Sequence, residues 1–419
     1  MSPPGLRVRA ESTVHGGAVI AHDGGQALLV YYTIPGEVVE AEPSGRRGGL
    51  AYARAARVLQ PSPDRIEPRC PHFGECGGCV WQHARYQRQL EFKLQSVEEA
   101  WRGVGLRLPP DTPVLGMDDP WRYRIRGEFE ASYRRDGGVE FGFHRMRRHS
   151  VLPVRTCPIH DQRIERAMLA FGQAATELRV RGLQTLLLTA EPTGSGLLWH
   201  TRYRARGLPA PDAELAIRVA ELLPDLVLLD DSMDLEFWGL KFRVRSDTFV
   251  QTNYRQMLVL YRTVLDMLEP GPADSVLDLY AGIGTISVAV ARHAGSVTAI
   301  EENPKAMRLA GVNARINGIG NVRTLSGRVE DALREIRTGR HQAAVLDPPR
   351  AGCAAAAIAE LLRLAPDRLV YVSCEPTTHA RDVSLLVRGG YRVRRAVVVD
   401  MFPHTYHVES VVLLERSAC

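Results

Sequence analysis

The strongest constraint on the fold is a regular alternation of short apolar runs and amphipathic segments after Val250. The apolar runs predict strands at residues 275–279, 297–300, 343–346 and 369–372. The amphipathic segments predict helices near residues 286–293, 304–317 and 355–364. Such alternation is typical of an α/β fold with a doubly wound, Rossmann-like parallel sheet. Two later runs, 392–400 and 407–414, predict an antiparallel closing pair.

A glycine-containing turn joins the first of these strands to the first helix. It runs from Asp278 to Thr285, and its glycines, Gly282 and Gly284, let the backbone approach a ligand beside the helix N-terminus. Glu301 ends the next strand, where a carboxylate can bind ribose hydroxyls. The turn has two of the three glycines of a dinucleotide fingerprint, so it favours a cofactor such as S-adenosylmethionine over nicotinamide. An ordinary tight turn is the alternative.

Two reactive side chains follow the next strands. Asp347 precedes two prolines that stiffen the turn, so we expect its carboxylate to point into the crevice where open sheets bind ligands. Cys374 ends the following strand at the same edge. A lone cysteine after a buried strand is more often a small apolar residue, and Cys353 is a second thiol in reach. The Asp-Pro-Pro sequence also resembles amino-group methyltransferases, which need no such thiol.

A nucleophilic thiol at this edge suits methylation of a pyrimidine carbon. C5 of uracil is a weak nucleophile until a thiolate adds at C6 and turns C5 into an enolate carbon. A base must then remove the C5 proton, and Glu409 on the last strand is the candidate. An exposed strand glutamate is the alternative. A free cysteine has a pKa near ~8.5, so a positive field is needed to make Cys374 a thiolate at neutral pH.

A second cysteine set lies nearer the N-terminus. Cys70, Cys76, Cys79 and Cys157 supply four thiolates, enough for an iron–sulfur cluster or a structural zinc, and their spacing does not separate the two. The chain has seven cysteines, an odd number, and no export signal, so metal or catalytic use is favoured over disulfides. Unligated buried cysteines are the alternative reading.

The amino-terminal residues predict a different architecture. Apolar runs at 18–20, 27–32, 37–41 and 51–59, separated by glycine-rich turns, predict a small β-barrel. Three prolines among residues 61–68 predict a linker. Beyond it, a helix near 86–101 and strands near 123–133 and 139–143 predict a central α+β region. We therefore expect three domains: 1–60, 61–245 and 246–419.

Charge permits a nucleic-acid partner without requiring one, because the net charge is +5 and nearly all basic residues are arginine. Arg122, Arg124 and Arg126 recur at period two, which places them on one face of a strand, and Arg145, Arg147 and Arg148 follow. We predict that they contact RNA phosphates; a solvated face is the alternative. No apolar run approaches the roughly 18 residues that span a bilayer, and residues 1–5 do not resemble a signal peptide. We expect a cytoplasmic monomer without an obligate protein partner.

Together these motifs resemble the RNA uracil-5-methyltransferase family, and in particular its bacterial 23S rRNA branch, which has an N-terminal TRAM barrel and a four-cysteine cluster. The resemblance covers nearly the whole chain. The matching stretches are residues 61–79, 249–253, 278–284, 347–350, 372–374 and 402–405, with Glu409.

The resemblance implies roles for individual residues. The ligands of a [4Fe–4S] cluster would be Cys70, Cys76, Cys79 and Cys157. S-adenosylmethionine would be bound by Gln251, Tyr280, Gly282, Gly284, Glu301 and Asp347. Cys374 falls on the nucleophile and Glu409 on the base, which implies methylation of uridine C5 in RNA, with 23S rRNA favoured and the tRNA T-loop as the alternative. This complete set argues against a binding protein with a vestigial site. Glu375 departs from the family, which usually has Asn there, and Thr285 stands where some members have Asn.

Overall fold

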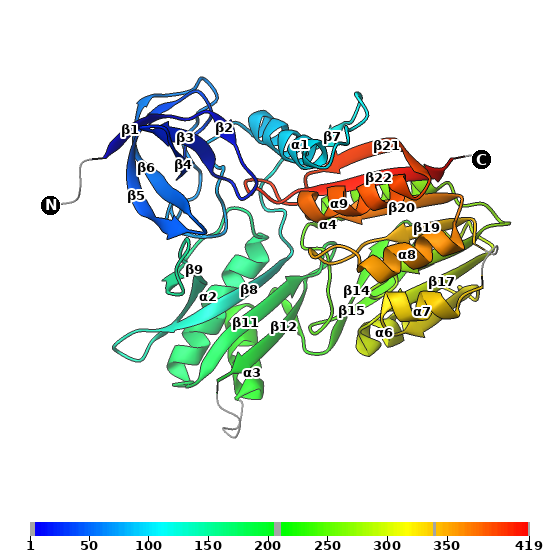
Figure 1. The fold of residues 1–419 in the computed structure, drawn as a ribbon. Helices are drawn as coiled ribbons and strands as arrows, with labels where there is room; N and C mark the ends of the chain where they lie inside the picture. The colour runs from blue at the N-terminus through cyan, green and yellow to red at the C-terminus, as the bar shows by residue number, and fades with distance from the viewer. Residues whose placement is uncertain (1–4, 205–210, 338–340, 418–419) are drawn as a thin grey trace.

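An eight-stranded sheet forms the carboxyl-terminal half of the computed structural model, which describes residues 5–204, 211–337 and 341–417 (Figure 1). Its strand order is β18-β17-β16-β19-β20-β22-β21-β7. The five parallel strands are β16 (Ser275–Leu279), β17 (Ser296–Glu301), β18 (Val322–Ser326), β19 (Ala343–Leu346) and β20 (Arg368–Ser373). The predicted doubly wound sheet is therefore confirmed.

Helices cover both faces of this sheet, so its central strands are buried on both sides and read as apolar runs rather than alternating ones. The helices are α4 (Tyr254–Leu268), α5 (Thr285–Ala291), α6 (Pro304–Ile316), α7 (Val329–Glu335), α8 (Ala355–Leu364) and α9 (Pro376–Arg388). The antiparallel strands β21 (Tyr391–Val399) and β22 (Glu409–Arg416) form the predicted closing pair. β22 also pairs with β20, so it lies between β20 and β21.

Three pieces from earlier in the chain join the same sheet and its core. β7 (Val114–Leu115) pairs in parallel with β21 at the sheet edge. α1 (Tyr86–Gly103) packs against α9, and its Trp101 lies in one buried cluster with Leu277 and Tyr371 of the central strands. The hairpin of β14 (Ser232–Phe237) and β15 (Leu240–Arg245) packs with α4 in a second cluster. The domain boundaries stay a prediction.

A separate six-stranded sheet forms the barrel-like amino-terminal unit (Figure 1). Its strands are β1 (Leu6–Arg9), β2 (Ser12–Thr13), β3 (Val19–Asp23), β4 (Gln26–Tyr31), β5 (Val38–Arg47) and β6 (Leu50–Gln60). β1 pairs with β5 and β2 pairs with β3, although only two residues separate β1 from β2. The first segment thus bends to join both edges of the sheet, which leaves the apolar side chains inside.

The third sheet has the order β10-β9-β8-β11-β12-β13, with α2 and α3 packed on it. Its elements are β8 (Arg126–Tyr133), β9 (Val139–His144), β10 (Val151–Pro153), α2 (Gln162–Glu177), β11 (Leu183–Ala190), β12 (Gly196–Tyr203), α3 (Asp212–Leu222) and β13 (Val227–Leu229). No helix in the described ranges is long and apolar enough to cross a bilayer. Cys419 lies outside those ranges.

The period-two arginine face was a wrong prediction. Strand β8 starts only at Arg126, and Arg122 has a φ of 51°, so the three arginines do not share a strand face. Arg122 pairs with Glu165 at 2.6 Å, and Arg126 donates to the Ser246 carbonyl at 2.7 Å. These two side chains bond to neighbouring loops of the same chain, and the Arg122 side chain is still 37% exposed. Among the arginines that follow them, Arg147 and Arg148 are exposed and Arg145 pairs with Glu75.

Candidate active site and cysteine cavity

The pairing register of the large sheet brings Cys374 and Glu409 together. Ser373 of β20 pairs with Ser410 of β22 in the antiparallel ladder, so the next positions, Cys374 and Glu409, face each other across the same two strands. Cys374 follows the last residue of β20, and Glu409 is the first residue of β22. The predicted nucleophile and base are therefore neighbours, although 34 residues of chain separate them.

The predicted cofactor residues follow the neighbouring strands at the same edge. Leu279 of β16 pairs with Leu346 of β19, which pairs with Tyr371 of β20. Tyr280 and Asp347 come directly after the first two of these residues. The sheet edge thus places the glycine turn, Asp347 and Cys374 in a row, as expected for the carboxyl ends of parallel strands.

Both glycines of the turn adopt backbone conformations that favour glycine. Gly284 has a φ of 79°, and a Cβ there would lie 2.9 Å from the Cβ of Ala310 in α6, so only glycine lets the two helices approach. Gly282 also has a positive φ, and its Cβ position faces open space. The Gly282 amide donates to the Glu301 carboxylate at 3.0 Å. That bond fixes the carboxylate beside the turn.

Gln251 lies in the segment before α4 and is 7% exposed. Two residues later, the Asn253 side chain caps α4 and donates to the Met401 carbonyl at 3.0 Å. This bond joins the Gln251 segment to the connection between β21 and β22, which ends at Glu409. Tyr280 has a φ of 64°, so its side chain leaves the strand end in an unusual direction.

Burial and charge set the protonation state of the Cys374 thiol. Burial, followed by the Glu409 and Asp347 carboxyls, raises the pKa of the Cys374 thiol to about 11, while Arg350 opposes the shift. The thiol is therefore protonated near neutral pH unless Arg350 or a ligand supplies more positive field. Arg350 also contacts the His407 ring nitrogen Nδ1 at 3.2 Å. Sequence reasoning gave Arg350 no role, although it ends the Asp-Pro-Pro-Arg motif.

The candidate base is buried, which corrects the alternative of an exposed strand glutamate. Glu409 is 5% exposed. Burial and the neighbouring Asp347 raise the pKa of its carboxyl well above the usual range, against Arg350 and Lys93. Burial also raises the pKa of Asp347 to about 7. A carboxylate with a raised pKa is a stronger proton acceptor than an exposed one.

The rival thiol, Cys353, is buried in the same apolar cluster as Tyr371. Its sulfur lies 3.5 Å from the Tyr371 hydroxyl, and its amide donates to the Asp382 carboxylate at 2.7 Å. The Tyr371 hydroxyl donates to the same carboxylate at 2.6 Å. Cys353 is thus part of a buried hydrogen-bonded network beneath the sheet edge.

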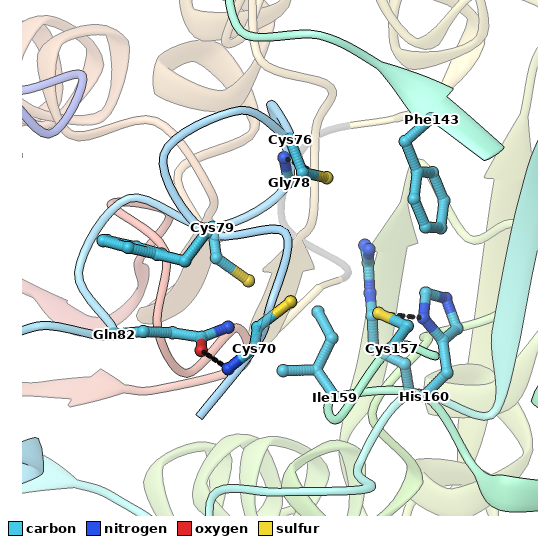
Figure 2. Close-up of a pocket in the computed structure, with 11 residues that line it drawn as sticks. Cys70, Cys76, Gly78, Cys79, Gln82, Phe143, Cys157, Ile159 and His160 are labelled. Carbon is cyan, nitrogen blue, oxygen red and sulfur yellow. Dashed lines mark hydrogen bonds between the residues drawn. The ribbon is translucent and has the colours of Figure 1, made fainter. Parts of the chain in front are cut away.

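The other four cysteines meet at a cavity of about 50 Å³ (Figure 2). The cavity is lined by Cys70, Cys76, Cys79 and Cys157, with Phe73, Gly78, Gln82, Arg124, Phe143, Ile159 and His160. The Cys157 sulfur lies 3.1 Å from the His160 ring nitrogen Nδ1, and burial raises the pKa of that thiol to about 12. Among the described residues, no group of three or more His, Cys, Asp or Glu has a geometry that could hold a metal ion.

Known proteins resemble the chain along almost its full length. The profile of the tRNA (Uracil-5-)-methyltransferase family matches residues 224–417. An uncharacterized RNA methyltransferase of Halalkalibacterium halodurans is 32% identical, over 98% of this chain and 96% of the relative. A 23S rRNA (uracil(1939)-C(5))-methyltransferase of Alkalilimnicola ehrlichii is 34% identical, over 96% of this chain and 95% of the relative.

A solved structure has the same fold. The tRNA (uracil-54, C5)-methyltransferase of Pyrococcus abyssi, in complex with S-adenosyl-L-homocysteine, superposes with a TM-score of 0.75 at 22% identity, over 98% of this chain and 100% of that one. The structural similarity shows the fold alone, whereas the long alignments with bacterial relatives also show the family. The chain belongs to the RNA (uracil-5-)-methyltransferase family.

Proposed function

We propose that this protein transfers a methyl group from S-adenosylmethionine to C5 of a uridine in RNA, with Cys374 as nucleophile and Glu409 as base. The observation that carries the proposal is the register of β20 and β22, which sets this thiol beside this carboxyl at the edge shared with Asp347. The amino-group alternative uses the Asp-Pro-Pro turn but gives no reason for a buried carboxyl opposite a thiol.

S-adenosylmethionine would occupy the edge formed by the glycine turn. Glu301, held by the Gly282 amide, is placed to accept bonds from ribose hydroxyls. Tyr280, Gly284, Asp347 and Gln251 complete the proposed binding set. The Pyrococcus abyssi methyltransferase, which has the same fold and was solved with S-adenosyl-L-homocysteine, supports this choice of cofactor. When bound, the sulfonium supplies an electrophilic methyl group.

The residues of the chain divide the reaction between them. The Cys374 thiolate adds to C6, and the C5=C6 electron pair moves into an enolate that spans C5, C4 and O4. C5 then takes the methyl carbon, and the sulfonium–carbon bond breaks. The Glu409 carboxylate removes the C5 proton, the double bond re-forms, and the C6–sulfur bond breaks to release the thiolate. One proton and S-adenosylhomocysteine leave with each methylated uridine.

The two roles predict different defects. Cys374→Ala should abolish methyl transfer and covalent RNA binding, because no thiolate adds to C6. Glu409→Gln should slow release by about 10²-fold or more and leave a protein–RNA adduct visible on a denaturing gel. Cys353→Ala is the matched control and should still form and release the adduct. Turnover retained in Cys374→Ala would favour the amino-group alternative and sink the covalent one.

Arg350 should control how adduct formation depends on pH. The pKa of Cys374 is raised to about 11, so its thiolate fraction, and with it the single-turnover rate of adduct formation, should rise as pH rises from about 7 to 9. Arg350 opposes that raised pKa. Arg350→Gln should therefore slow adduct formation about tenfold at neutral pH and move the rise to higher pH, as one pKa unit is a tenfold change in thiolate. A pH profile that Arg350→Gln leaves unchanged would contradict this role.

The substrate is expected to be 23S rRNA. The Alkalilimnicola ehrlichii relative, which is named as a 23S rRNA methyltransferase, aligns over 96% of this chain. Purified protein given labelled S-adenosylmethionine should methylate a uridine in 23S rRNA transcripts and leave tRNA unlabelled. Mapping 5-methyluridine in total RNA from cells with and without the gene gives the position. Labelling confined to the tRNA T-loop would establish the alternative substrate instead.

We also propose that Cys70, Cys76, Cys79 and Cys157 bind a [4Fe–4S] cluster. Although no three of the described donor side chains form a ready site for a single ion, four thiols from two segments line one cavity, with apolar walls from Phe73, Phe143 and Ile159. This donor set supports the proposal. Burial raises the pKa values of Cys79 and Cys157, so as free side chains these thiols stay protonated at neutral pH. A metal cluster binds cysteines as thiolates. When bound, the cluster would cross-link residues 70–79 to residue 157 in a structural role.

This assignment has a direct analytical test. Protein purified without oxygen should carry about four iron atoms and four acid-labile sulfides per chain. Cys79→Ser should lose most of both and lower the thermal midpoint, whereas Cys353→Ser should keep them. One zinc ion per chain without sulfide would show a structural zinc site in place of the cluster.

A further inference from the structure

Lys93 is an unusual residue in this chain. Lys93, Lys241 and Lys305 are its only lysines, and arginine serves everywhere else as the cation. Lys93 lies on α1 and is 0% exposed, among the largest fully buried side chains. A buried ammonium loses several kcal/mol of hydration and is retained only with close polar partners. Burial accordingly lowers the pKa of Lys93, against the attraction of Asp400.

The partners of Lys93 lie on one short segment. Its ammonium forms an ion pair with the Asp400 carboxylate, and it donates to the carbonyls of Phe402 at 2.9 Å and His407 at 2.7 Å. Three acceptors match the three hydrogens of an ammonium. The other Asp400 carboxylate oxygen accepts from the Tyr86 hydroxyl at 2.6 Å. A planar guanidinium, with five donors in a fixed fork, does not match this set of acceptors.

That segment is the connection that ends at the candidate base. β21 ends at Val399 and β22 begins at Glu409, so residues 400–408 join them without a strand or helix. Lys93 contacts both ends of this connection, at Asp400 and at His407. Glu409 is two residues beyond His407, and its charge interacts with that of Lys93.

The middle of the connection is also held from outside. The His404 amide donates to the Gln89 side chain at 2.9 Å, one turn of α1 before Lys93. His404 has a φ of 68°, and its ring stacks on Trp121 with 3.9 Å between centroids. A side chain in the left-handed region is strained and persists only where its surroundings impose it. The contacts from α1 supply that constraint.

We propose that Lys93 is a positioning residue for proton removal: it fixes the connection from Asp400 to His407 so that the Glu409 carboxylate faces the C5 proton. The inference rests on the proposed role of Glu409. Lys93 touches neither substrate nor cofactor in this role; it acts through the backbone of the connection and through its charge. Loss of Lys93 should therefore affect release of the RNA and leave earlier steps intact.

The experiment compares Lys93→Met with Lys241→Met, an exposed lysine on β15 that pairs with Glu236 at 3.0 Å and serves as the matched control. A third protein, Lys93→Met with Asp400→Asn, removes both buried charges and so avoids leaving one unpaired. Three quantities are measured: affinity for S-adenosylmethionine, the rate of adduct formation, and the rate of adduct breakdown. RNA with 5-fluorouridine traps the adduct independently of the base, because C5 carries fluorine in place of the proton that the base must remove before the C6–sulfur bond can break.

Lys93→Met and the double variant should bind S-adenosylmethionine within about twofold of wild type and form the trapped adduct. On ordinary RNA they should accumulate adduct that breaks down about 10²-fold more slowly, as expected for Glu409→Gln. Breakdown at the wild-type rate would overturn the proposal. Equal loss of cofactor binding and adduct formation in both Lys93 proteins would overturn it too, in favour of a general structural role. Failure of the wild type to trap fluorinated RNA would instead refute the covalent mechanism itself.

Discussion

The insertion of β22 between β20 and β21 is the constraint on which the active site depends. In an antiparallel ladder, opposite residues have Cα atoms roughly 4.5–5.5 Å apart, so a pairing of Ser373 with Ser410 leaves Cys374 and Glu409 little freedom to separate. A shift of one residue would turn every β22 side chain to the other face of the sheet. The apolar run of β22 is buried on both faces, with Val411 in one cluster and Val412 and Leu414 in the other. Such a shift would therefore be felt most at Glu409, whose side chain would turn away from Cys374.

This arrangement concentrates negative charge in a poorly hydrated edge. Asp278, Asp347 and Glu409 are all held above their usual pKa, chiefly by burial, and Asp347 and Glu409 also repel each other. Arg350 and Lys93 are the cations that oppose the shift at Glu409. The same balance acts on Cys374: the carboxyls of Glu409 and Asp347 disfavour its thiolate form, and Arg350 favours it. A cationic sulfonium bound at this edge would favour the ionised forms of all these groups.

Local sequence predicted the buried parts of the fold well. The bounds of β16, β19 and α8 agree with the apolar runs, because strands and helices buried by their neighbours leave a clear pattern. β18 was missed because it is a largely exposed edge strand without an apolar run. The arginine face failed because Arg122 adopts a left-handed backbone conformation, which period-two reasoning does not anticipate. The roles of the motif residues stay predictions, and the burial of Glu409 could not be predicted because it depends on long-range packing.

Lys93 was noticed only as a rare residue type, because its partners lie more than 300 positions later in the chain. Such contacts show why the cysteine-bearing segment and the methyltransferase sheet are not independent. The amides of Val80 and Trp81, directly after Cys79, both donate to the His404 carbonyl, at 3.0 and 3.1 Å. The cysteine cavity is thus linked to the connection before Glu409 through one residue, Val80, and its hydrogen bond to His404. An interaction that orders Cys79 therefore also orders the segment before Glu409, so the proposed structural role of the cavity and the proposed catalytic role of Glu409 depend on the same stretch of backbone.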